Sequence, residues 1–90
     1  MIEIEKYHGQ YVELALACGS YGWGRVMHNN EGTFLLGAKM NGPVQNPNGS
    51  QCFREEYIRN VKEGQSNSSI EEIDPEQITR IKDITDLIES

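Results

Sequence analysis

Apolar side chains recur at every second position through most of the segment between residues 12 and 40. A period of two is typical of a β-strand, whose successive side chains point to opposite faces of a sheet. The first long run covers residues 11–18, and its apolar face consists of Val12, Leu14, Leu16 and Cys18. A shorter run at residues 2–5 alternates isoleucine with glutamate. The pattern predicts a strand at each place, with Cys18 in the core.

A turn signal divides the later part of this segment. Alternation covers residues 22–28 and residues 33–40, and Asn29, Asn30, Glu31 and Gly32 separate the two runs. Asparagine and glycine tolerate the positive φ angles that tight turns need. The two runs therefore predict a β-hairpin over residues 22–40. Three glycines within residues 19–24 predict a turn or a bulged strand start before it.

The segment after the hairpin is rich in residues that interrupt a strand ladder. Residues 41–50 hold two prolines, two glycines and three asparagines. Such a composition predicts a loop that is longer than most hairpin connections. Long ordered loops often carry function, so its polar side chains are candidates for binding. They are Asn46, Asn48 and Gln51.

Residues 51–63 fit two structures. Apolar side chains recur at every fourth position, at Phe53, Tyr57 and Val61. This spacing suits a helix with Ser50 as its N-cap and Gly64 just past its end. The alternative is a turn at residues 54–56 followed by a strand at residues 57–62. We favour the turn and strand.

The C-terminal segment also fits two structures. Asp74, Pro75 and Gln77 have the residue types of a helix N-terminus. The isoleucines that would line such a helix are Ile78, Ile81, Ile84 and Ile88. The alternative is one helical turn at residues 75–77 followed by a strand at residues 78–84. A weak similarity between residues 56–63 and 76–83 favours this alternative, although two short copies do not define a repeat.

Together these elements predict one mainly β (or α+β) domain over residues 1–90. We expect a small barrel or a curled antiparallel sheet of about five strands, with a short helix or helical turn near the C-terminus. This arrangement resembles SH3-like and Sm-like barrels in general architecture, because they also place a short helical turn before the last strand. The resemblance implies architecture only, since a fold of this kind does not determine function.

Charge is unevenly distributed along the chain. The net charge is -6, and residues 71–90 carry seven acidic side chains against Arg80 and Lys82. This acidic segment would repel a phosphate backbone, so we expect no direct contact with nucleic acid. It suits a basic protein partner, or it keeps the protein in solution. Its candidate contact residues are Glu71, Glu72 and Asp74.

The residues that could carry chemistry are few. The possible metal ligands are His8, His28, Cys18 and Cys52, and no two have ligand spacing. No hydroxyl or thiol has a base placed beside it by the sequence, and the glycine cluster lacks the ending of a phosphate-binding loop. We therefore expect no catalytic residue, no metal, no cofactor and no enzymatic activity.

The N-terminal residues alternate charged with apolar side chains, unlike a signal peptide. The sequence also has no run approaching the roughly 20 apolar residues of a membrane span. We expect a cytoplasmic protein without a membrane partner, whose two thiols stay reduced rather than forming a Cys18–Cys52 bridge.

An aromatic cluster within the glycine-rich stretch is a second candidate surface. Tyr21, Trp23 and Arg25 are of the types enriched at binding hot spots, and the glycines would let a partner approach closely. The structural alternative is that the rings pack over glycine backbone inside the fold. For the predicted loop at residues 41–50, the alternative to a binding surface is a solvated connector.

Three hypotheses about function follow. The first is a non-enzymatic binding module that contacts a protein partner or another copy of itself through sheet edges or the aromatic cluster. The second is an acidic inhibitor or immunity-type protein that blocks a basic, nucleic-acid-processing partner. The third is a small-ligand protein in which Trp23 or Tyr21 stacks on a nucleotide-like molecule. We favour the first.

Overall fold

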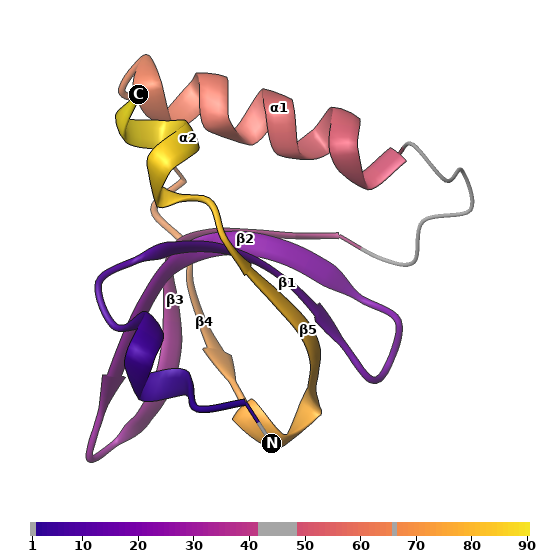
Figure 1. Cartoon of the computed structure of the whole chain (residues 1–90), viewed down its shortest axis with the longest axis vertical. Coiled ribbons are helices and arrows are strands. Elements are labelled where there is room, and N and C mark those ends of the chain that lie inside the picture. The colour runs from indigo at the N-terminus through magenta and orange to yellow at the C-terminus, as the bar shows by residue number, and fades with distance from the viewer. Residues whose placement is uncertain (1, 42–48, 66) are drawn as a thin grey trace.

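The structure is a computed structural model that describes residues 2–41, 49–65 and 67–90, with the backbone alone at residues 49–52. Short 3-10 helices (η), strands and α-helices follow one another along the chain (Figure 1). They are η1 (Ile4–Tyr7), β1 (Tyr11–Leu16), β2 (Tyr21–Asn29), β3 (Gly32–Asn41), α1 (Gly49–Lys62), β4 (Ile70–Ile73), η2 (Pro75–Gln77), β5 (Ile78–Asp83) and α2 (Thr85–Glu89).

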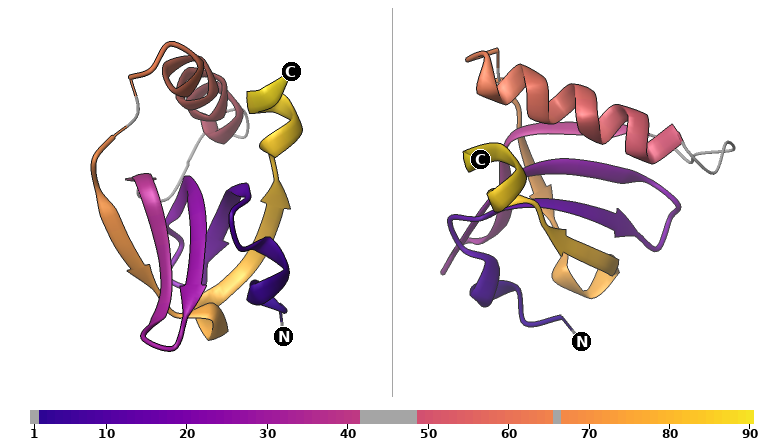
Figure 2. Two further views of the ribbon diagram at one scale, coloured as in Figure 1. Left: turned by 90° about the vertical axis from the view of Figure 1, so that its left-hand side faces the viewer. Right: turned by 45° about the horizontal axis from the view of Figure 1, so that its top comes forward.

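The strands form one antiparallel sheet in the order β4-β3-β2-β1-β5. The sheet curls, and β4 and β5 stand on opposite sides of the opening (Figure 2, left). Within the described residues these two strands do not pair with each other, so the curl does not close into a barrel. The predicted mainly β domain is confirmed in its curled-sheet form, with the short helix near the C-terminus.

The predicted hairpin is β2 and β3, which pair from Asn29 and Gly32 at the turn. Farther along, Gly24 of β2 faces two residues of β3, Gly37 and Ala38, because the register shifts there. Gly37 has a φ of 62°, the left-handed conformation that glycine adopts without strain. An extra residue of this kind bends a strand and increases its twist. The bulge therefore contributes to the curl of the sheet.

Each face of the sheet carries its own core. The concave core consists of Ile4, Val12, Leu14, Val26, Leu35, Ala38, Ile73 and Ile78. The opposite face is covered by α1 and α2 (Figure 2, right). The residues buried there are Tyr21, Trp23, Tyr57 and Ile84. Period-two alternation in β1 and β2 thus supplies apolar groups to two separate layers.

Two predictions near the N-terminus are wrong. Residues 2–5 do not form a strand, because the chain turns into η1, which buries Ile4 against the concave core. Four alternating residues are too few to distinguish a strand from such a turn. Cys18 is exposed rather than in the core. The backbone N–H of Gly19 donates to the Leu16 carbonyl at 2.9 Å, so the strand ends in a turn before Cys18.

The predicted turn at residues 54–56 and strand at residues 57–62 are also wrong, since this segment is α1. The helical alternative is the observed one, except that the helix includes Ser50. Beyond its end, Gly64 (φ 77°) donates to the Val61 carbonyl, and Gln65 donates to the Asn60 carbonyl at 2.7 Å. This pair of bonds is a Schellman motif, which satisfies the last carbonyls of a helix.

The predicted loop at residues 41–50 lies outside the described residues at 42–48. Its last two residues, Gly49 and Ser50, belong to α1.

At the C-terminus the helical turn and strand are confirmed as η2 and β5. The Asp74 carboxylate accepts a hydrogen bond from the Glu76 backbone N–H at 3.0 Å, as an N-cap does. Ile78 then turns into the concave core, and Ile84 turns into the core beneath the helices. A single helix over this C-terminal segment could not place Ile78 and Ile84 in the two separate cores.

We predict that Gly24→Ala lowers the free energy of unfolding by about 1–3 kcal/mol, because it overpacks the bend of the sheet. A Cβ at this position would lie 2.9 Å from the Leu35 Cβ and 3.3 Å from the Leu36 carbonyl oxygen. Chemical denaturation of the variant and the wild type measures the difference.

Gly9→Ala is the control, because Gly9 has a positive φ of 82° but no atom within 4 Å of the added Cβ. It should cost only the local backbone strain, about 1 kcal/mol. Equal midpoints for Gly24→Ala and the wild type would contradict the proposed role of the bend.

Candidate functional site

The aromatic residues predicted as a contact surface lie inside the fold. Trp23 is fully buried, and Tyr21 is only 7% exposed. The Trp23 ring meets Tyr21 edge-on at 5.3 Å between centroids and stacks on Tyr57 of α1 at 6.1 Å. Its Nε1 donates a hydrogen bond to the Glu13 carboxylate at 2.9 Å. The structural alternative is therefore the observed one, and the rings offer no surface to a partner.

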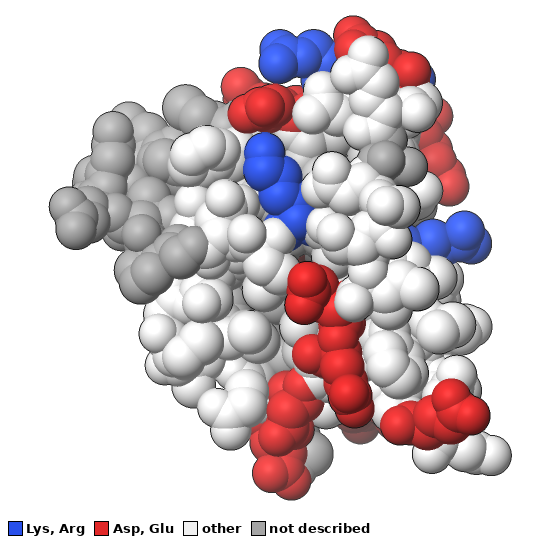
Figure 3. Space-filling view, turned by 180° about the vertical axis from the view of Figure 1, so that it is seen from behind, with Lys and Arg blue, Asp and Glu red and all other residues white. Residues whose placement is uncertain are grey.

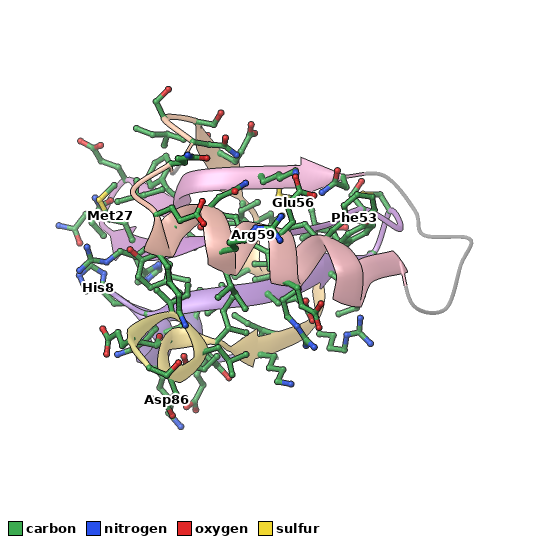
Figure 4. The ribbon with its side chains drawn as sticks, turned by 90° about the horizontal axis from the view of Figure 1, so that it is seen from above. His8, Met27, Phe53, Glu56, Arg59 and Asp86 are labelled. Atoms are coloured by element: carbon green, nitrogen blue, oxygen red, sulfur yellow. The ribbon has the colours of Figure 1, made fainter. Side chains whose placement is uncertain are left out.

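Charged side chains surround this aromatic core and link α1 to the sheet. Arg54 Nη1 lies 3.8 Å from Glu13 Oε1, with both side chains mostly buried. On the opposite flank, Lys39 Nζ lies 3.8 Å from Glu56 Oε1 and 5.9 Å from the centroid of the Phe53 ring. Figure 4 shows Phe53 and Glu56 on α1 above the sheet. These contacts position the helix, so we interpret them as structural.

The phenol of Tyr57 is the most perturbed group of the helix-covered core. It donates to the Gly37 carbonyl at 3.3 Å. Burial, and to a lesser extent the phenol of Tyr11, raises the pKa of Tyr57 to about 12. Burial also raises the pKa of Tyr21. Both shifts have a structural cause and need no bound ligand.

The other predicted binding residues are dispersed. Arg25 is exposed, and its Nε donates to the Gly9 carbonyl at 3.1 Å. Asn46 and Asn48 lie outside the described residues. Gln51 belongs to α1, but its side chain is also outside the described set. A loop surface formed by these residues therefore remains a prediction.

His8, His28 and Cys18 do not assemble into a centre, and the side chain of Cys52 is outside the described set. The His28 backbone N–H donates to His8 Nδ1 at 3.1 Å, and His28 Nδ1 lies 2.7 Å from Thr33 Oγ1. Among the side chains that the structure describes, no three His, Cys, Asp or Glu residues are grouped to hold a metal ion. Cys18 is exposed, and hydrogen bonds with Ser20 lower the pKa of its thiol.

The predicted acidic residues lie along one edge of the sheet. Glu71 and Glu72 belong to β4, and Asp74 follows it; all three are exposed. Glu71 pairs in register with buried Leu35 and Glu72 with Phe34, so the two glutamates point to opposite faces of the sheet. Ile70, at the start of the strand, is 64% exposed. This edge therefore presents acidic groups on both faces beside an apolar side chain.

The opposite edge carries basic side chains that the sequence analysis did not select. Arg80 and Lys82 of β5 are exposed and lie two residues apart. They pair in register with Ala15 and Glu13 of β1, so they share the face that α1 covers. Their spacing is visible in the sequence, but only the strand order shows that β5 is an edge of the sheet.

Acidic side chains extend over the whole face of the molecule that is seen from behind. In its lower half, toward the end where η2 lies in Figure 1, the charged side chains in view are acidic, whereas in its upper half acidic and basic side chains lie among one another (Figure 3). A hollow of about 570 Å³ beside the β4 edge is lined by His28, Thr33, Glu72 and Asp74, among others. The two sheet edges, of opposite charge, are the candidate functional surfaces.

Comparisons with protein-family models, with curated proteins and with solved structures give no significant match. In the described parts of the chain, no helix is both long and apolar enough to cross a membrane.

We predict that the free energy of unfolding falls as the pH rises from about 10 to about 12. In this range the unfolded state has lost the Tyr57 proton, because the ordinary pKa of tyrosine is about 10. The folded state keeps the proton, because its pKa is about 12. Stability is therefore fully retained below pH 10 and decreases through this window. Denaturation of the wild type and of Tyr57→Phe at each pH measures the effect.

Tyr57→Phe should show a smaller decrease, because phenylalanine has no proton to lose. Tyr7→Phe, at a half-buried position beside the other core, is the matched control. Identical pH dependence of the wild type and Tyr57→Phe would contradict this account.

Proposed function

We propose that this chain is a non-enzymatic binding module that associates with further copies of itself, the β4 edge of one copy pairing with the β5 edge of the next. The observation that supports this proposal is that, among the described residues, the sheet ends in two unpaired edges whose net charges are opposite. Glu71, Glu72 and Asp74 mark one edge. The other carries Arg80 and Lys82 on one face and Asp83 on the opposite face, a net charge of +1. An unpaired strand edge offers backbone donors and acceptors to another strand.

Charge favours unlike edges over like ones. Pairing two β4 edges would bring Glu71 and Glu72 of one copy against the same residues of the other. Pairing two β5 edges would bring Arg80 and Lys82 of one copy against the same residues of the other. Like charges directly opposite each other destabilise a strand pair, whereas opposite charges stabilise it by roughly 0.2–1 kcal/mol. The favoured contact is therefore heterologous, and it leads to rings or to open chains of subunits.

The alternation along β4 makes this match insensitive to strand direction. Glu71 and Glu72 point to opposite faces, whereas Arg80 and Lys82 share a face. Parallel pairing continues the sheet with like faces together, and antiparallel pairing continues it with the faces exchanged. In either case one glutamate lies on the same face as Arg80 and Lys82.

The size of the edge sets the expected strength. β4 has four residues, so about half of its backbone groups point outward. The resulting few hydrogen bonds each contribute about 0.5–1.5 kcal/mol. Exposed ion pairs add little more, and salt screens them. We therefore expect association that is weak, concentration-dependent and reduced by salt.

A basic protein is the second candidate partner for the β4 edge, as in an acidic inhibitor. It is favoured by the three exposed acidic side chains and the hollow beside them. The small-ligand hypothesis required stacking on Trp23 or Tyr21. Both rings are buried, so we do not propose nucleotide binding at that position.

We predict that reversing the charge of either edge abolishes self-association and that mixing the two variants restores it. The variants are Glu71→Lys/Glu72→Lys, which makes both edges basic, and Arg80→Glu/Lys82→Glu, which makes both acidic. Each repels copies of itself, but each edge of one variant complements an edge of the other. Sedimentation velocity over a range of protein concentrations measures the mass of each variant and of the equimolar mixture.

The control matched to Glu71→Lys/Glu72→Lys is Glu5→Lys/Glu63→Lys, which changes the net charge by the same amount at exposed positions outside β4 and β5. It should associate like the wild type. A wild type that stays monomeric at every concentration would contradict self-association. Loss of association in both edge variants without recovery in the mixture would contradict pairing of unlike edges. Binding of a basic protein by a monomeric wild type, lost in Glu71→Lys/Glu72→Lys, would support the inhibitor hypothesis instead.

A further inference from the structure

A groove of about 580 Å³ runs between α1 and α2, apart from both sheet edges. Ligand sites in proteins commonly measure 300–1,000 Å³. Residues from the two helices line it, namely Arg54, Ile58, Arg59, Lys62 and Leu87, together with two glutamates discussed below. Figure 4 shows α2 beside α1, with Asp86 on the side of α2 that faces away from α1.

Helical spacing explains why these side chains converge. Arg54, Ile58 and Lys62 are four residues apart and therefore form one row along α1. Arg59 lies in the adjacent row. Because α2 has only five residues, it covers part of this face and leaves the remainder open. Near the C-terminal end of α1, Lys62 Nζ donates to Ser90 Oγ at 3.3 Å and links the helices.

The groove has an apolar part that solvent reaches. Leu87 is one of the few large apolar side chains that are strongly exposed, at 44%, and Ile58 is half-buried. Covering them with an apolar group would remove apolar surface from water, which favours binding. A ligand that fills the groove therefore needs an apolar body.

The charges around this apolar part define the rest of the ligand. Three bases and two acids, Glu55 and Glu63, line the groove, a net charge of +1 in a chain whose net charge is -6. Arg54 is already paired with Glu13. Within the described residues neither Arg59 nor Lys62 makes an ion pair, but Lys62 is hydrogen-bonded to Ser90. The Arg59 guanidinium is therefore the group best placed to receive a carboxylate in a bidentate contact. The two glutamates would repel a second negative charge.

We propose that the groove between α1 and α2 binds an amphiphilic monoanion, a single carboxylate on an aliphatic chain. The chain would lie on Ile58 and Leu87, and the carboxylate would reach Arg59 and Lys62. Glu55 and Glu63 disfavour polyphosphates, because their carboxylates repel additional negative charge. This proposal is independent of edge pairing, because none of the lining residues lies on β4 or β5.

The test is a titration of the whole chain with octanoate, followed by two-dimensional ¹H–¹⁵N NMR of the backbone amides. Octanol and octylammonium are matched probes with the same chain and a neutral or positive head. Octanoate should shift amides of α1 and α2 at millimolar or lower concentration, and it should bind more tightly than either matched probe. Arg59→Gln should weaken octanoate binding roughly three- to tenfold, as expected for one exposed charge-assisted contact.

Two further variants separate the head from the tail. Leu87→Ser, at an exposed position, should weaken octanoate and octanol alike. Lys6→Gln removes an exposed base outside the groove and should leave octanoate binding unchanged. The proposal is overturned if octanoate shifts no helix amide, if octanol or octylammonium binds as tightly, or if Arg59→Gln and Lys6→Gln bind octanoate equally.

Discussion

The bend in the β2–β3 ladder is the constraint on which the rest of the structure depends. Gly24 has no side chain to clash with Leu35, and Gly37 adopts a positive φ opposite it. This bulge lets the long hairpin curl around the concave core. The curl brings β4 and β5 to the two sides of an opening, but the described residues include no strand that pairs across it. The unpaired edges therefore follow from the same feature that forms the core.

The second layer follows from the opposite face of the same strands. Trp23 lies on that face and is fully buried, because Tyr57 and the rest of α1 cover it. The Glu13 carboxylate accepts from the indole and also faces Arg54, so it joins the sheet, the aromatic core and the helix. Since the short α2 covers α1 only partly, a groove with an apolar floor remains between the helices. The molecule thus has two kinds of accessible surface, the charged edges and the groove.

Local patterns predicted the elements whose residues interact mainly with their neighbours in sequence. Alternation predicted β1 and the hairpin, and Asp74 with Pro75 predicted η2. The spacing of Phe53, Tyr57 and Val61 does not distinguish a helix from a strand, because residues four apart share a face in both structures. The sequence allowed the burial of Trp23 as an alternative, but it did not show what covers the ring, since the covering helix lies about 30 residues later in the chain. Arg80 and Lys82 were overlooked because only the strand order shows which strand is an edge.

Amide hydrogen exchange as a function of protein concentration tests the central claim most directly, because it reports on each strand of the unmodified chain. If unlike edges pair, outward-facing amides of β4 and β5 exchange more slowly as protein concentration rises in low salt. Amides of the central strands β2 and β1 should exchange at the same rate throughout. Exchange at β4 and β5 that is independent of concentration, or protection at only one of these edges, would contradict the pairing of unlike edges.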